Sequence, residues 1–97
     1  MLGDVRGTLE ETFYGNRFYA QFLGIPYAEA PLGGLRFAPP KPLSNNWNGT
    51  VREANLQPSA CLQIDPTTED VFGAEDCLLL NIYIPRKNVE SLIYCSL

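Results

Sequence analysis

The sequence has 97 residues, a net charge of −4 and no histidine. Because a nucleic-acid-binding surface needs clustered Lys and Arg, the seven scattered basic residues argue against nucleic acid as a partner. A chain without imidazole cannot by itself pair a Ser or Cys nucleophile with a His base.

The first predicted elements form an antiparallel hairpin. Residues 3–9 have the pattern of one short strand, and the aromatic-rich stretch 18–25 has the pattern of a returning buried strand. Between them, Gly15 and Asn16 tolerate a positive φ and therefore predict a tight turn.

A proline-rich passage at 21–40 reads QFLGIPYAEAPLGGLRFAPP. Its prolines remove backbone donors and forbid regular structure for most of its length, although residues 32–36 have room for one helical turn. We interpret residues 26–42 as an ordered, irregular connector. Its side chains Leu32, Leu35 and Phe37 need apolar cover elsewhere.

The second half predicts a long polar loop followed by a strand. Residues 56–74 are polar and broken by Pro and Gly, with Thr67 or Thr68 suited to cap a single helical turn through Phe72. Residues 78–84 alternate in the manner of a half-buried strand, which Pro85 ends. A further strand could begin within 91–97.

Several of these motifs together resemble a known family. They are FLGIPYAEAPLGGLRFAPPKP, the tryptophan of NNWNGT and, above all, EDCLLLNIYIP at 75–85. They are similar to the N-terminal part of type-B carboxylesterases, which share the α/β-hydrolase fold and include cholinesterase-like enzymes and non-catalytic adhesion relatives. The resemblance implies that residues 1–86 are the N-terminal portion of such a domain, made mainly of strands and ordered loops. Residues 87–97 are then a divergent tail, which we attribute to truncation.

The resemblance also assigns roles to two pairs of residues. Cys61 and Cys77 match half-cystines that close a loop in the family. From the residues alone they flank a polar loop with little core, and two separate buried thiols are the alternative. Arg36 and Glu75 match a family ion pair that pins the proline-rich passage to the base of that loop. Taken alone, such charges are more often solvated.

Two further features bear on the branch of the family. In cholinesterases the corresponding loop carries a tryptophan that binds the choline cation, whereas residues 62–76 contain none, which disfavours a cholinesterase. Asn48 begins the sequence Asn-Gly-Thr, an acceptor for N-glycosylation that matters only in a secreted protein. Because this triplet also arises by chance, its occupancy stays open.

We assign no catalytic residue within the chain. The resemblance implies a Ser on a G-x-S-x-G elbow, an acidic residue, a later His and an HGGG-type oxyanion turn, and none of these is present. The acidic residues of 65–76 miss the spacing of a Ca²⁺ loop, so we expect neither a metal nor a cofactor.

Three hypotheses remain for the function. The leading one is a fragment of a serine carboxylesterase that acts on a small carboxylic ester and is inactive alone. The second is a fragment of a non-catalytic, neuroligin-like adhesion ectodomain. The third is a free-standing chain with no stable fold, which would expose the edge of strand 78–84.

The compartment and the assembly state are less constrained. The disulfide and the acceptor triplet favour the secretory route. The first residues lack the basic start and apolar core of a signal peptide, which leaves a cytoplasmic esterase open. No apolar run is long enough to cross a bilayer. The ester identity and the oligomeric state stay open.

Overall fold

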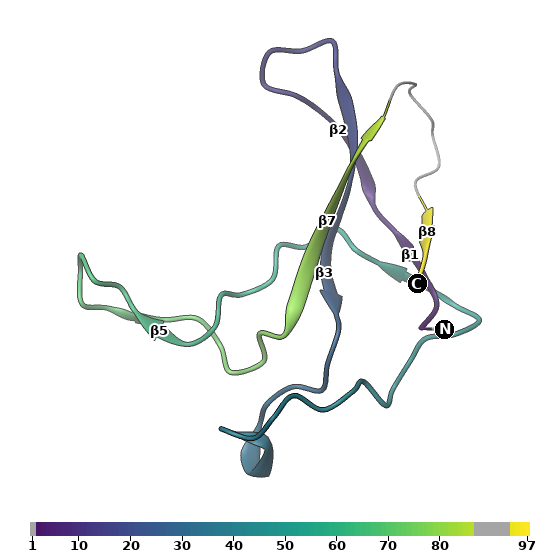
Figure 1. The fold of residues 1–97 in the computed structure, drawn as a ribbon. Helices are drawn as coiled ribbons and strands as arrows, with labels where there is room; N and C mark the ends of the chain where they lie inside the picture. Colours follow the sequence, from purple (N-terminus) through teal and green to yellow (C-terminus); the bar gives the residue numbers. More distant parts are fainter. Residues whose placement is uncertain (1, 87–93) are drawn as a thin grey trace.

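Short β-strands dominate the computed structural model, which describes residues 2–86 and 94–97. The strands are β1 (Asp4–Arg6), β2 (Thr8–Glu11), β3 (Phe18–Pro26), β4 (Val51–Glu53), β5 (Gln63–Ile64), β6 (Val71–Phe72), β7 (Leu79–Arg86) and β8 (Tyr94–Ser96). They form three sheets, with strand orders β4-β1-β8, β2-β3-β7 and β5-β6 (Figure 1). The helical part of the described residues is one 3₁₀ turn, η1 (Gly33–Leu35), which confirms the single turn expected in the proline-rich passage.

The predicted hairpin is confirmed as β2 and β3, which pair antiparallel from Thr8↔Gln21 to Glu11↔Phe18. The expected single strand over residues 3–9 is wrong, because the chain breaks at Gly7 into β1 and β2, which belong to different sheets. A side chain at Gly7 would clash with the carbonyl oxygen of Gln21. The chain therefore changes sheets at the one residue that permits so close an approach to β3.

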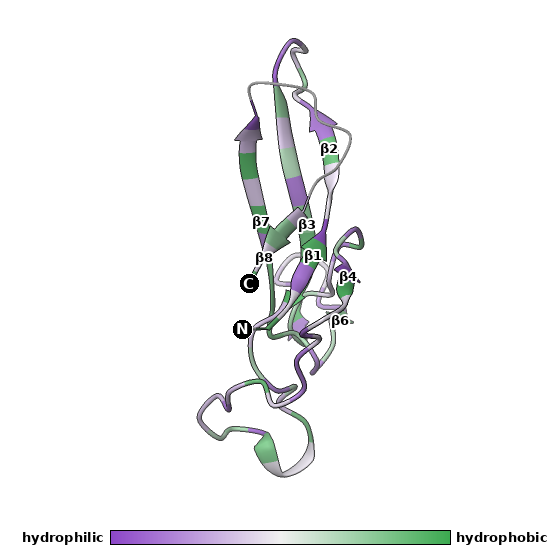
Figure 2. Cartoon of the chain, turned by 90° about the vertical axis from the view of Figure 1, so that its right-hand side faces the viewer, coloured by the Kyte–Doolittle hydropathy of each residue, from purple (hydrophilic) through white to green (hydrophobic). Residues whose placement is uncertain are grey.

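β7 pairs antiparallel with β3 and lies at the edge of the sheet β2-β3-β7. The hydropathy of its residues alternates along the strand (Figure 2), and β7 runs through Pro85 to Arg86, so the expected end of the strand at Pro85 is wrong. The register shifts between Phe22 and Ile25, where Gly24 has a φ of 75°. The Gly24 N–H donates to Oδ1 of Asn81 over 3.0 Å, so a β7 side chain satisfies the donor that this bulge frees.

The loop predicted for residues 56–74 contains a small hairpin. β5 and β6 pair antiparallel, so the expected helical turn through Phe72 is wrong. The anchor of the turn is Asp65, whose Oδ1 accepts from the N–H of Thr67 over 2.7 Å and of Thr68 over 3.3 Å. An Asp side chain that binds the backbone ahead of it forms a turn in this way without starting a helix.

Most of the predicted tail, residues 87–93, lies outside the described residues. The strand expected near the C-terminus is present as β8, which pairs antiparallel with β1. Leu97 extends this pairing, because its N–H donates to Gly3 O over 2.9 Å and its carbonyl accepts from Leu2 N over 2.8 Å.

The described residues bury a small core. It consists of Val5, Ala20, Phe22, Ile25 and Ala54, with Ile82 of β7 among the partly buried residues around it. The radius of gyration is 16.1 Å, whereas a compact domain of this length has about 12.5 Å. The molecule extends over 45 × 40 × 16 Å, so it is thin. A thin layer cannot cover all apolar side chains, and Phe37, for which we expected cover, is 97% exposed.

Candidate functional site

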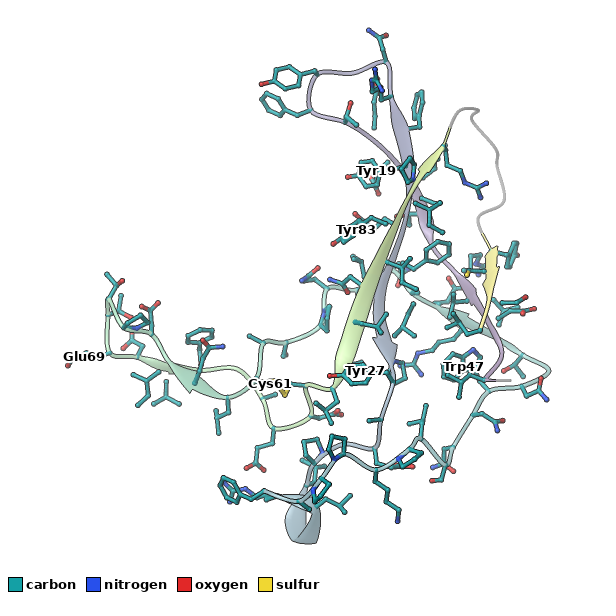
Figure 3. All side chains as sticks on the ribbon, in the orientation of Figure 1. Tyr19, Tyr27, Trp47, Cys61, Glu69 and Tyr83 are labelled. Carbon is teal, nitrogen blue, oxygen red and sulfur yellow. A yellow bond between two sulfur atoms is a disulfide. The ribbon has the colours of Figure 1, made fainter. Side chains whose placement is uncertain are left out.

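The disulfide between Cys61 and Cys77 closes the base of an arm formed by residues 62–76. The S–S distance is 2.05 Å and the two Cα atoms are 5.0 Å apart. Cys61 lies where the arm leaves the rest of the molecule, and Glu69 lies at its far end (Figure 3). Since the arm holds little core of its own, the covalent bond fixes where it begins and ends.

Backbone contacts at the base of the arm support the disulfide. The N–H of Ala74 donates to Ala60 O over 2.9 Å, and the N–H of Leu62 donates to Ala74 O over 3.1 Å. Gly73 has a φ of 97°, and a side chain there would clash with the carbonyl oxygen of Cys61. The two chain segments therefore approach closely only because position 73 is glycine.

Arg36 and Glu75, the other predicted pair, lie together beside the disulfide. Arg36 Nε is 2.9 Å from Glu75 Oε1, and the two side chains are 53% and 38% exposed. At this exposure an ion pair contributes at most about 1 kcal/mol. Its main effect is positional, because it ties the residue after η1 to the residues just before Cys77.

A shallow hollow of about 300 Å³ lies at this junction. Arg36 and Glu75 line it together with Pro31, Phe37, Leu62, Ala74 and Cys77. The Arg36 guanidinium also lies 5.3 Å from the centre of the Phe37 ring, a cation–π distance. The hollow lies where the proline-rich passage meets the base of the arm. Among its lining residues there is no nucleophile with a base beside it.

Sequence reasoning missed another contact that joins two segments, the hydrogen-bonded pair Glu29 and Ser44, called the Glu29 clip below. The N–H of Ser44 donates to Glu29 Oε1 over 2.6 Å, and the Ser44 hydroxyl donates to the same oxygen. These two hydrogen bonds hold the pKa of the Glu29 carboxyl below its ordinary value of 4.5. They connect Glu29, within the proline-rich passage, to the segment that follows the passage, and no motif marks these two residues as partners.

The described serines show no catalytic arrangement. The Ser44 hydroxyl is used by Glu29, and the Ser96 hydroxyl donates to Asp4 Oδ1 over 2.8 Å. Ser59 is exposed, and Ser91 lies outside the described residues. Among residues 2–86 and 94–97, no three His, Cys, Asp or Glu side chains converge to hold a metal ion.

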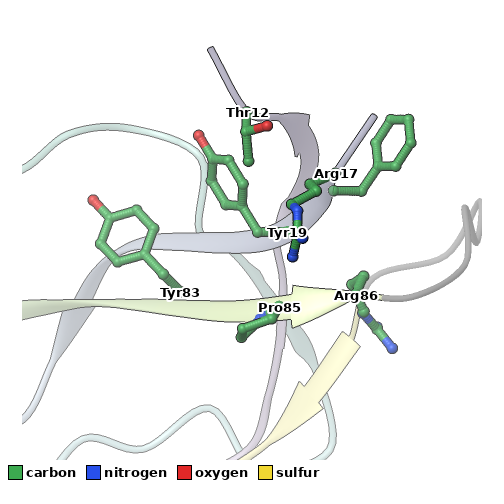
Figure 4. A pocket seen from close by; sticks show the side chains of 7 residues that line it. Thr12, Arg17, Tyr19, Tyr83, Pro85 and Arg86 are labelled. Atoms are coloured by element: carbon green, nitrogen blue, oxygen red, sulfur yellow. The ribbon is translucent and has the colours of Figure 1, made fainter. Parts of the chain in front are cut away.

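A larger hollow, of about 470 Å³, opens between the ends of β2, β3 and β7 (Figure 4). Its lining is mostly apolar and consists of Thr12, Arg17, Phe18, Tyr19, Tyr83, Pro85 and Arg86. The rings of Tyr19 and Tyr83 are 6.2 Å apart. The side chains that line this hollow include no acid–base pair suited to ester chemistry.

The remaining predicted residue, Asn48, is exposed in a turn. Trp47, which precedes it, lies near the N-terminus in Figure 3, well away from Cys61. The predicted site residues therefore fall into two groups, one at the base of the arm and one at this turn. Within the described residues, no helix is long and apolar enough to span a membrane.

Comparison with known proteins gives one family. The sequence model of the carboxylesterase family matches residues 1–93. The chain is 42% identical over 95 residues to acetylcholinesterase of Gallus gallus, which covers 87% of this chain and 12% of the relative. It is 42% identical over 90 residues to esterase E4 of Myzus persicae, covering 92% and 16%.

A third relative is cocaine esterase of Homo sapiens, 40% identical over 100 residues, with 91% of this chain and 18% of the relative covered. The chain thus spans less than a fifth of the length of each of these proteins. The names of all three are those of esterases, and none supports the adhesion alternative.

Proposed function

Because this chain belongs to the carboxylesterase family, we propose that it forms the N-terminal part of a serine carboxylesterase with the α/β-hydrolase fold. The family match over residues 1–93 carries the proposal. The substrate is a small carboxylic ester, and the reaction transfers its acyl group to water through an acyl-serine. The catalytic Ser, its His and the oxyanion hole belong to the rest of such a domain.

In this proposal the chain itself is scaffold. The motifs that carry the resemblance lie within residues 1–86, and the family model matches residues 1–93. The disulfide and the Arg36–Glu75 pair hold the arm against the proline-rich passage. With no histidine in its 97 residues, the chain alone does not hydrolyse esters.

The proposal places the protein in the secretory pathway. A structural disulfide persists in oxidising compartments and is rare in the cytosol. The Cys61–Cys77 bond closes an arm whose residues are mostly exposed, so the arm has little buried apolar surface to stabilise it if the bond is reduced.

The test begins with the transcript. We would sequence it beyond the codon for Arg86, express the longest product and measure hydrolysis of 4-nitrophenyl acetate. We expect a G-x-S-x-G serine, and we expect that its replacement by Ala abolishes turnover. A product that carries no such serine and does not hydrolyse the ester would contradict the proposal.

A second measurement uses the 97-residue chain itself. We expect it to release 4-nitrophenol no faster than its own Ser44→Ala variant, because the Ser44 hydroxyl is committed to Glu29 and has no His beside it. Turnover by the wild-type chain that Ser44→Ala removes would show that the chain carries its own nucleophile.

A further inference from the structure

Residues 47–50 form a tight turn that presents Asn48 to solvent. The N–H of Thr50 donates to Trp47 O over 2.9 Å. Gly49, at the third position, has a φ of 86°, which is the conformation that a type II turn requires there. Asn48 occupies the outward-facing second position, and within the described residues its only hydrogen bond is from its backbone N–H to Asn46 Oδ1. Its side-chain amide is therefore free to be modified without loss of a contact.

The base of this turn is fixed to the core. The N–H of Trp47 donates to Leu2 O over 2.9 Å, and its indole Nε1–H donates to Asp4 O over 2.8 Å. Gly3 lies so close that any side chain there would clash with the indole ring. The Arg52 guanidinium lies 5.5 Å from the centre of the same ring. A group attached to Asn48 is therefore carried by a turn whose preceding residue, Trp47, is held in place.

Within the part of the chain that the structure describes, the strand that follows the turn has an unpaired edge. β4 is the outer strand of the order β4-β1-β8, and all three of its residues are exposed. Val51, its first residue, is 47% exposed. An exposed edge strand is a template for pairing with another chain unless charge, a bulge or a covering group blocks it. Val51 stands three positions after Asn48.

We propose that Asn48 carries an N-linked glycan and that this glycan covers the free edge of β4. Asn48-Gly49-Thr50 is the single acceptor triplet of the sequence. The inference rests on the secretory route given under Proposed function. A glycan is bulky and solubilising, and here it lies at the start of the edge that needs cover.

The attachment is a group transfer from an oligosaccharide linked to a lipid diphosphate. Asn48 Nδ2 forms a bond to C1 of the first sugar, while the bond between C1 and the diphosphate oxygen breaks. The lipid diphosphate leaves with the electron pair, and the amide nitrogen loses one proton to a base of the transferase. Thr50 supplies the hydroxyl of the acceptor triplet, and in the folded chain this hydroxyl donates to Trp47 O over 2.7 Å.

The first experiment directs the chain into the endoplasmic reticulum with a cleavable leader. We expect the wild type and Thr50→Ser to carry a glycan that peptide N-glycosidase removes, converting Asn48 to Asp in the tryptic peptide that ends at Arg52. Asn48→Gln and Thr50→Ala should carry none. A wild-type chain secreted without a glycan would overturn the proposal. Since the leader imposes the compartment, this result does not depend on whether the complete protein is an esterase.

The second experiment tests the role at the edge. We expect light scattering to show more self-association for Asn48→Gln than for the glycosylated chain at equal concentration. Adding Val51→Lys to Asn48→Gln should restore the scattering of the glycosylated chain, because a Lys blocks strand pairing at an edge. Equal scattering by the glycosylated and unglycosylated chains, or failure of Val51→Lys to restore it, would refute the covering role.

Discussion

Opening the disulfide should remove about 3 kcal/mol from the free energy of unfolding. The perturbation is the double replacement of Cys61 and Cys77 by Ser. The two cysteines are 16 positions apart, and in the chain-entropy model a loop of that length constrains the unfolded chain by this amount. Cys95→Ser is the matched control, because Cys95 is a free, half-buried thiol whose loss opens no loop.

The assay is urea unfolding followed by the fluorescence of Trp47, the single tryptophan of the sequence. For an m-value of about 1.5 kcal/mol/M, we expect the midpoint of the double variant to fall by about 2 M, or the chain to unfold outright. Trp47 lies away from the arm in Figure 3, so a shift also shows that arm and sheet unfold together. Equal midpoints for the double variant and Cys95→Ser, with equal proteolysis of residues 62–76, would refute the reasoning.

Two further predictions concern the bulge and the Glu29 clip. Gly24→Ala should lower the free energy of unfolding by about 1–2 kcal/mol, because the φ of Gly24 is 75° and a Cβ there would lie 2.9 Å from Leu56 O. Gly34→Ala is the control. A Cβ at position 34 meets nothing within 4 Å, so this variant should be near neutral in the same urea titration. Since hydrogen bonds from Ser44 lower the pKa of Glu29, their stabilisation is present above the unfolded pKa and is lost as the pH falls through the lower folded value. Ser44→Ala should raise the Glu29 pKa toward 4.5 in an NMR titration, and an unchanged pKa would contradict the assignment.

The parts of the fold that could be predicted rest on local signals. Gly15 and Asn16 have positive φ in the turn between β2 and β3, as their residue types indicate. The alternation over residues 78–84 gives most of β7, and the proline-free residues 32–36 leave room for the short η1 turn. In each case the residues that carry the signal are next to one another in the chain.

The missed parts depend on contacts between distant residues. The break at Gly7 follows from the close approach of Gln21, and nothing in residues 3–9 signals that approach. The parallel pairing of Asp4 with Val51 joins two short polar strands, neither of which alternates for long enough to be recognised. The contact between Glu29 and Ser44 likewise exists only because the fold brings the segment after the proline-rich passage back to Glu29.

The candidate site also has one part that could be predicted from the sequence and one part that could not. The resemblance to the family assigned Cys61–Cys77 and Arg36–Glu75, and both pairs lie within bonding distance at the base of the arm. Neither pairing follows from residue type alone, since Cys95 is a third thiol of the same chemistry. The hollow beside Tyr19 and Tyr83 had no sequence signal, because it is formed by the ends of three strands that meet only in the fold.

The pairing of β3 with β7 also sets the order of events during synthesis. The register joins Phe18 to Arg86, so the buried side chains Ala20 and Phe22 of β3 receive their β7 neighbours only after about 60 further residues have been made. At roughly 5–20 residues per second, β3 leaves the ribosome several seconds before β7 does. During that interval a nascent chain carries an uncovered apolar strand. Its yield in a cell should therefore depend on chaperones that bind such segments and on the rate of elongation between Pro26 and Leu79.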